Sequence, residues 1–261
     1  MATKFTIYRG FPPHPTHVWS PFVNKLEARF RLAALPYRID VGSPRHAPRG
    51  KIPYLATTTT PDNNTTLLGD TALITRALIT SNHLPDLNAS LPPAVRAKDM
   101  AVRALFEERL YFLLQRERWV DNYYAMRDGV LGALPWLVRV VVGNLAYRGV
   151  TAGLQSQGTG RYSREEVGEM KREVWEGLDG LLGEARAAGG GREKPFWVLG
   201  GEEPTEADAT VYGFVVAGLV CTAYVLSSLT FSPSPLLPPH FSLCDRSVRR
   251  VWTNLCCVHS A

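Results

Sequence analysis

The first 220 residues of this 261-residue chain contain no cysteine. That absence excludes a disulfide framework, or a zinc site that uses cysteine thiolates, from most of the chain. The four cysteines all follow, at Cys221, Cys244, Cys256 and Cys257. The amino terminus also lacks the apolar stretch of a signal peptide. Both absences indicate a reducing compartment, and we expect a cytoplasmic protein.

The chain also lacks a cluster of charge of one sign. It has 29 lysine and arginine residues against 24 aspartate and glutamate residues, and the two signs alternate, as in Arg164-Glu165-Glu166. A nucleic-acid-binding surface needs a clustered basic stripe, so we expect no nucleic-acid partner. The slight positive excess favours small anionic ligands. His14 and His17 flank a proline without a third ligand nearby, so we expect no metal site.

The first 84 residues alternate between strand and helix patterns. The β-branched and aromatic run 5–8 predicts a strand. A helix then begins with Ser20 as its cap and Pro21 at its first position, and it ends before Pro36. Apolar residues recur on one face of this helix. Polar residues point the other way: Asn24, Lys25, Glu27, Arg29 and Arg31. A second strand over 37–41 completes a predicted parallel pair with a right-handed crossover.

A β-hairpin and another helix complete this part. Residues 57–60 and 65–68 flank the turn signal Pro61-Asp62-Asn63-Asn64, which predicts the hairpin. Gly69-Asp70-Thr71 then begins a helix with one apolar face. A sheet with helices packed on it predicts a compact α/β unit over 1–84.

Helical patterns dominate after a linker at 85–93, over 94–119, 136–147 and 163–188. Ser163 and Glu166 form a predicted capping box, and Asp208 at the third position after Thr205 suggests a similar arrangement. The stretch 209–231 has no charged residue and is long enough to span a membrane. Its cap and its glycines instead favour a buried core helix, so we expect no membrane partner. We therefore assign 85–220 to one all-helical domain.

The order of several short motifs resembles the glutathione transferase superfamily. The motifs are Trp19-Ser20-Pro21-Phe22, Lys51-Ile52-Pro53-Tyr54-Leu55, Gly69-Asp70-Thr71 and Thr205-Glu206-Ala207-Asp208. Two further stretches, 157–166 and 196–200, are similar to the metaxin and failed-axon-connections branch, including its fungal members. The resemblance covers about residues 4–220. It implies an α/β plus all-α fold class, with a thioredoxin-like domain followed by a glutathione-transferase-type helical domain.

Ser20 is the sharpest candidate for catalysis. By resemblance it lies where related enzymes carry a catalytic serine or cysteine, at the positive end of a helix. A hydroxyl there can donate to the sulfur of glutathione and lower the pKa of the thiol. The alternative is that Ser20 only caps the helix. Tyr8 is the second candidate, because some classes use a tyrosine at that position, although a strand-end packing role also fits it.

The resemblance also implies a binding site for glutathione as co-substrate. Ile52-Pro53 is similar to a cis-proline turn whose backbone pairs with the cysteinyl residue, although an ordinary trans loop remains open. Lys51 would meet the glycyl carboxylate, with Arg49 as an alternative. Thr71 would hold the γ-glutamyl carboxylate, with Asp70 near its ammonium group. Asp70 is also sufficient as a helix cap by itself.

Two functions follow from the resemblance. One is a glutathione transferase-like enzyme, with homodimerisation possible, that conjugates or reduces a small electrophile. The alternative is a non-catalytic metaxin-like interaction module, located at the surface of the mitochondrial outer membrane. The resemblance stops after about Leu219, where a Ser/Pro/Leu run and the cysteines begin. We hypothesise that 221–261 derives from a retained intron or a frameshift, which would leave a core face uncovered.

Overall fold

The computed structural model describes residues 3–12, 14, 16–59, 61, 64–188 and 196–223. Most of the C-terminal segment 221–261 lies outside the described residues, so the hypothesis about its origin and the uncovered core face stays a hypothesis. Asp62 and Asn63 of the predicted turn also lie outside the described residues. Contacts divide the chain into two compact units. The first comprises residues up to Asp99 together with Trp197–Val220, and the second includes Met100–Phe196.

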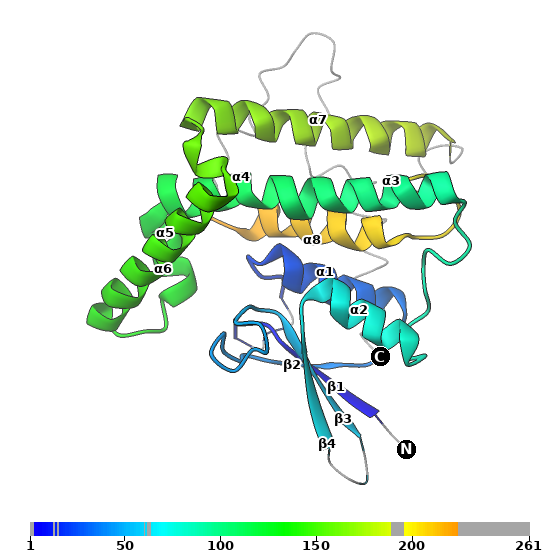
Figure 1. Cartoon of the computed structure of the whole chain (residues 1–261), viewed down its shortest axis with the longest axis horizontal. Coiled ribbons are helices and arrows are strands. Elements are labelled where there is room, and N and C mark those ends of the chain that lie inside the picture. Colours follow the sequence, from blue (N-terminus) through cyan, green and yellow to red (C-terminus); the bar gives the residue numbers. More distant parts are fainter. Residues whose placement is uncertain are drawn as a thin grey trace. The chain divides into compact units, whose positions relative to one another are not determined.

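A mixed sheet forms the base of the first unit (Figure 1). Its strands are β1 (Thr3–Tyr8), β2 (Arg38–Asp40), β3 (Tyr54–Thr59) and β4 (Asn64–Gly69), in the order β2-β1-β3-β4. β1 and β2 are parallel, whereas β3 pairs antiparallel with β1 and with β4. The predicted parallel pair and the predicted hairpin are both confirmed.

Two helices, α1 (Pro21–Leu32) and α2 (Thr71–Thr80), pack on one face of this sheet. The core between them is apolar and consists of Phe5, Ile7, Leu26, Phe30, Leu55, Ile74, Leu78 and Leu84. Alternate residues of β1 and β3 point to the opposite face. There Tyr8 and Tyr54 stack with ring centroids 4.5 Å apart. Gly42, at φ +65°, lies against both rings, and a Cβ there would be 2.6 Å from Cβ of Tyr8.

The polar face of α1 is buried, although an amphipathic pattern normally exposes it. Helix α8 (Glu206–Val220) belongs to the first unit and packs along α1. Gly213 makes this approach possible, because a Cβ there would lie 2.4 Å from the carbonyl oxygen of Pro21. α8 is apolar on all sides, as expected for a core helix. The predicted cap is confirmed: Asp208 accepts hydrogen bonds from the amide and hydroxyl of Thr205 at 2.8 and 2.9 Å.

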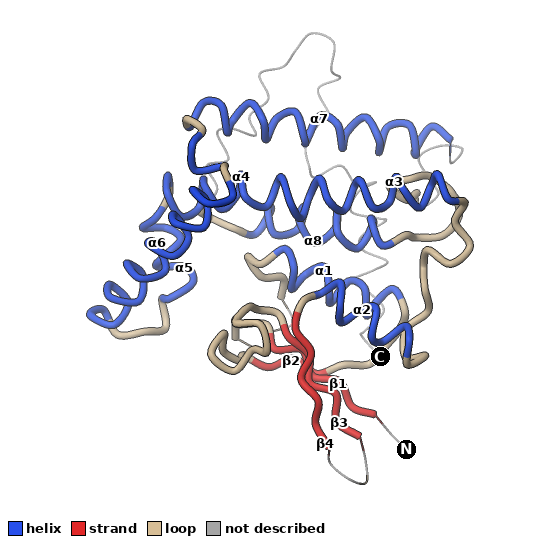
Figure 2. The backbone as a smooth tube through the Cα atoms, viewed as in Figure 1, coloured by secondary structure: helices blue, strands red, loops and turns tan. Residues whose placement is uncertain are grey.

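The second unit is helical (Figure 2). The predicted first helix is a continuous run, α3 (Pro93–Ala104), the π-helical η1 (Leu105–Leu110), α4 (Tyr111–Arg116) and η2 (Glu117–Asp121), and its first residues belong to the first unit. α5 (Tyr123–Leu131), α6 (Trp136–Gln157), the short η3 (Thr159–Arg161) and α7 (Arg164–Ala188) follow. α6 runs ten residues beyond the predicted end at residue 147.

Polar contacts fix the second unit at particular points. The capping box of α7 is confirmed, since Glu166 accepts from the amide of Ser163 at 2.7 Å and donates its own amide to the Ser163 hydroxyl. The buried pair Lys171–Glu117 joins α7 to η2 at 2.7 Å.

The fold class predicted from the sequence is confirmed: a thioredoxin-like α/β sheet unit is combined with a helical unit. The boundary at residue 84 stays a prediction, and the contacts assign α8 to the sheet unit. Among the described residues, no helix has both the length and the apolar character that a membrane crossing requires.

Candidate functional site

The sequence-predicted residues gather at one edge of the sheet. Strand register places Asp40, Tyr8, Tyr54 and Gly69 side by side in one row across the four strands. Pro53 and Asp70 therefore lie next to each other just outside this row. The loop that leads to Ser20 leaves β1 at the same edge. α1 connects the parallel strands β1 and β2 and therefore runs opposite to them. Its N-terminus consequently lies at the same edge as the end of β1.

Ser20 caps α1 as predicted. Its backbone is extended, and its hydroxyl oxygen accepts a hydrogen bond from the amide of Val23 at 3.4 Å. Ser20 is half-buried. A hydroxyl that accepts in this way keeps its own proton for a further bond. The capping role and a donor role toward a ligand atom are therefore compatible.

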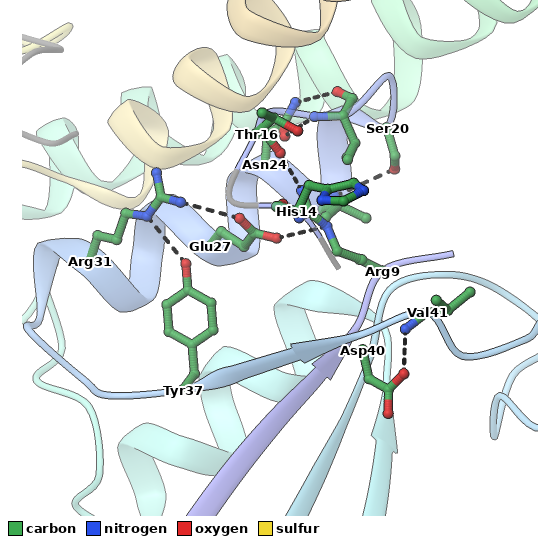
Figure 3. Close-up of polar contacts among 12 residues, drawn as sticks. Arg9, His14, Thr16, Ser20, Asn24, Glu27, Arg31, Tyr37, Asp40 and Val41 are labelled. Carbon is green, nitrogen blue, oxygen red and sulfur yellow. Dashed lines mark hydrogen bonds and ion pairs between the residues drawn. The ribbon is translucent and has the colours of Figure 1, made fainter. Parts of the chain in front are cut away.

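Two buried side chains fix the loop that carries Ser20 (Figure 3). Arg9 is fully buried, and its guanidinium donates to the carbonyl oxygens of His14 and Thr16, at 2.5 and 2.7 Å. The side-chain amide of Asn24 both donates to and accepts from the backbone of Val18, at 2.7 and 3.1 Å. The loop is thereby held at alternate residues up to two positions before Ser20.

Arg9 also takes part in a buried ionic network. Its Nε lies 3.3 Å from Oε1 of Glu27, as an ion pair without hydrogen-bond geometry, and Arg31 lies 3.3 Å from the other carboxylate oxygen. Arg31 also donates to the hydroxyl of Tyr37 at 3.2 Å. Burial raises the pKa of Glu27, and the two arginines oppose that shift. Two arginines against one carboxylate produce a positive potential beneath the loop.

His17, in the same loop, lies against α8. Its Nε2 is 3.2 Å from the hydroxyl of the buried Tyr212, and the two rings meet edge to face. Burial, and after it the nearby Arg31 and Arg9, lower the pKa of His17 from 6.5. The imidazole is therefore neutral at pH 7 and adds no charge to the network.

The peptide between Ile52 and Pro53 is cis, as the resemblance implied. Pro53 is buried, Ile52 half-buried and Lys51 exposed. Gly10 approaches Ile52 closely, since a Cβ at Gly10 would be 3.2 Å from two carbons of that side chain. The start of the loop to Ser20 and the proline turn are thus in contact.

Asp70 occupies two of the backbone amide donors at the N-terminus of α2. Asp70, at φ +74°, caps the helix, and its Oδ1 accepts from the amides of Ala72 and Leu73 at 3.0 and 3.1 Å. Those two amides are therefore not available to an anion. The amide and hydroxyl of Thr71 are the candidate donors at this helix end, and Thr71 is 5% exposed. The side chain of Arg49 lies against Gly69, one residue before this cap.

The two catalytic candidates lie on different faces of the sheet. Phe5 and Ile7 of β1 face the helices, so Tyr8, one residue on, points to the opposite face, where it stacks on Tyr54. Ser20 caps α1, which packs on the other face of the sheet. The catalytic roles of Ser20 and Tyr8 both stay predictions.

Sequence reasoning missed Arg9, Asn24 and Glu27 as parts of the site. Arg9 follows a strand without any motif, and the other two belong to the polar face of α1, which normally predicts solvent exposure. No local signal identifies them, because their burial depends on contacts between separate segments: Arg9 pairs with Glu27, Asn24 binds the backbone of Val18, and α8 packs along α1. Within the described ranges, no group of three His, Cys, Asp or Glu side chains is placed to hold a metal ion.

Part of the chain matches a known protein family. A family model of the glutathione S-transferase N-terminal domain matches residues 21–126. The match supports the glutathione transferase superfamily for this part of the chain. It includes Pro53, Asp70 and Thr71, and it begins one residue after Ser20.

Several solved structures are similar over most of the chain. A glutathione transferase family member from Pseudomonas fluorescens with two glutathione molecules bound is 13% identical, with 96% of this chain and 87% of that chain covered and a TM-score of 0.46. A glutathione S-transferase from Rhodospirillum rubrum is 18% identical, with 92% and 100% covered and a TM-score of 0.45.

A maleylacetoacetate isomerase from Anaeromyxobacter dehalogenans with bound dicarboxyethyl glutathione and citrate is 18% identical, with 97% and 87% covered and a TM-score of 0.42. Identities and TM-scores this low do not distinguish one reaction from another.

Proposed function

We propose that this protein binds glutathione at the sheet edge and uses its thiolate to conjugate or reduce a small electrophile. The observation that carries the proposal is the strand register, which brings the Pro53 turn, the start of α2 and the Ser20 loop to one edge. The family match over 21–126 supports the same ligand.

Each part of the tripeptide has a chemically suitable partner at this edge. The backbone amide and carbonyl of Ile52, beside the cis peptide, would pair with the cysteinyl residue in the manner of an added strand. The amide and hydroxyl of Thr71 would bind the γ-glutamyl carboxylate, and the carboxylate of Asp70 would attract the ammonium group. Lys51, which is exposed, would meet the glycyl carboxylate.

The sulfur would lie at the N-terminus of α1. There the Ser20 hydroxyl would donate to it, and the helix end and the positive network around Arg9 would favour the anion. Each of these interactions stabilises thiolate relative to thiol and so lowers the pKa of the sulfur. A fixed loop keeps the donor in place without reorganisation during the reaction. The same chemistry implies a reducing compartment that supplies glutathione, consistent with a cytoplasmic protein.

Calorimetry with glutathione and turnover of a chlorodinitrobenzene test the proposal. We expect the intact protein to bind glutathione below millimolar concentration. Ser20→Ala should retain that binding, lose at least about tenfold in kcat, and raise the pKa of the bound thiol in a thiolate-absorbance titration. Ser163→Ala is the matched control, because it removes a helix-capping hydroxyl from α7, outside the sheet unit. Unchanged turnover in Ser20→Ala would remove Ser20 from the mechanism.

The second function is that of a non-catalytic interaction module of the metaxin or failed-axon-connections type. The same calorimetry tests this function, since a shared fold does not dictate a shared function. Absence of heat on titration with millimolar glutathione would favour it over the enzyme.

A further inference from the structure

Asn24 is a buried polar residue near the start of α1. It is 1% exposed, although asparagine is unfavourable inside a helix and is mostly found at the protein surface. Its side chain binds outside the helix. Nδ2 donates to the carbonyl oxygen of Val18 at 2.7 Å, and Oδ1 accepts from the Val18 amide at 3.1 Å. Both polar atoms of the side chain therefore hold one buried residue of the preceding loop.

A third hydrogen bond of Asn24 holds Ser20 itself. The backbone amide of Asn24 donates to the carbonyl oxygen of Ser20 at 3.2 Å. The two residues are four positions apart, so they lie on the same face of α1 (Figure 3). Asn24 thus holds the backbone at Ser20 and, through its side chain, two residues earlier at Val18. These three hydrogen bonds form a frame around the loop end that carries the Ser20 hydroxyl.

The hydrogen bond of the Ser20 hydroxyl to its own helix is long. Its oxygen accepts from the amide of Val23 at 3.4 Å, which is beyond the usual range for N–H···O bonds. The bonds between Asn24 and Val18 are both shorter. The position of the hydroxyl therefore depends more on the backbone frame than on the capping bond. Loss of the Asn24 amide would leave the buried amide and carbonyl of Val18 without these partners, and the backbone would shift to regain hydrogen bonds.

We propose that Asn24 is a positioning residue, which holds the Ser20 hydroxyl where it donates to the sulfur of glutathione. The inference rests on the proposed function, because it concerns the same sulfur. A displacement of about 1 Å at a reacting group can cost about 100-fold in rate, so a rigid frame around the donor matters for turnover. The partners proposed for the tripeptide at Ile52 and Thr71 lie on other segments, so glutathione binding does not require this frame.

Kinetics of single and double variants test the proposal. Asn24→Leu has nearly the same shape and removes both side-chain bonds. We expect it to lower kcat by about tenfold, to raise the pKa of the bound thiol, and to leave glutathione affinity nearly unchanged. The double variant Ser20→Ala/Asn24→Leu should be no slower than Ser20→Ala alone. A residue that acts only through Ser20 has no further effect once the hydroxyl is absent, whereas a general structural loss would add to that of Ser20→Ala.

Asn88→Leu is the matched control. Asn88 is also buried, donates to the carboxylate of Asp99 at 2.8 Å, and accepts from the amide of Glu206 at 3.2 Å. Glu206 in turn binds Arg29, near the other end of α1. The control variant should lose stability in urea unfolding, as Asn24→Leu does, because both leave buried polar groups without partners. It should keep the kcat and the thiol pKa of the unaltered protein.

A second variant, Asn24→Ser, decides the test if Asn24→Leu does not fold. Its smaller side chain leaves room for water at Val18, so we expect a weaker effect on kcat in the same direction. Unchanged kcat and thiol pKa in the Asn24 variants would overturn the proposal. An equal loss of kcat in Asn88→Leu, or a double variant slower than Ser20→Ala by the full factor of Asn24→Leu, would do the same.

Failure of the proposed function gives a different result. In that case the unaltered protein itself would neither bind glutathione nor turn over the chlorodinitrobenzene, and both proposals would be wrong. If only the role of Asn24 is wrong, the unaltered protein is active and its Asn24 variants are equally active.

Discussion

Replacement of Gly213 by alanine would add a methyl group where α8 meets α1. The new Cβ would lie 2.4 Å from the carbonyl oxygen of Pro21 and 2.7 Å from the amide nitrogen of Lys25. Both are backbone atoms and cannot rotate away. An ordinary contact at about 3.4 Å therefore requires the two helices to separate locally by roughly 1 Å.

The expected cost follows from two opposing effects. Overpacking of a core contact costs about 1–3 kcal/mol, and a backbone clash lies at the upper end. Alanine in place of glycine also stabilises a helix by about 1 kcal/mol. Gly218 lies in the same helix, and a Cβ there would have no atom within 4 Å. Gly218→Ala therefore receives the helix-forming gain without the clash.

Urea unfolding followed by circular dichroism measures both variants. We expect Gly213→Ala to be less stable than Gly218→Ala by about 2–3 kcal/mol, and its Tm to be lower by roughly 2–4 °C for each kcal/mol. Equal stability of the two variants would refute the close α1–α8 contact. It would also undermine the explanation of why the polar face of α1 is buried.

Two further predictions concern the buried network. Arg9→Met should destabilise by about 3 kcal/mol because it leaves Glu27 buried with one partner fewer, and adding Glu27→Gln should recover part of the loss in urea unfolding. Arg109 of η1 and Glu173 of α7 form an exposed ion pair at 3.8 Å and provide the comparison. Removal of Arg109 should cost less than about 1 kcal/mol; equal costs would contradict the burial of Arg9. For His17, the folded pKa is lowered from 6.5, so the unfolded chain binds a proton first as pH falls. The free energy of unfolding should therefore decrease below about pH 6.5, and His17→Gln should flatten the profile; an unchanged slope would exclude His17 as the source.

Local interactions of this protein were readable from the sequence. Ser20 caps α1, Ser163 and Glu166 cap α7, and Asp208 caps α8 with Thr205. Each of these contacts joins residues three positions apart, so spacing and residue type are sufficient to predict it. The order of strand and helix patterns likewise gave the parallel pair and the hairpin. The cis peptide before Pro53 came from the family resemblance and not from spacing.

Only the tertiary structure decided which polar residues are buried. Arg29 was placed on the polar face of α1, yet it is 1% exposed and binds Glu206 at 2.6 Å across 177 positions of sequence. The same distant helix packs along α1 and contacts His17 through Tyr212. Leu137, Val141 and Leu145 of α6 show the opposite effect, since they are apolar residues but are more than half exposed. Composition and periodicity describe one helix at a time, whereas burial depends on the element that packs against it, and that element can lie anywhere in the chain.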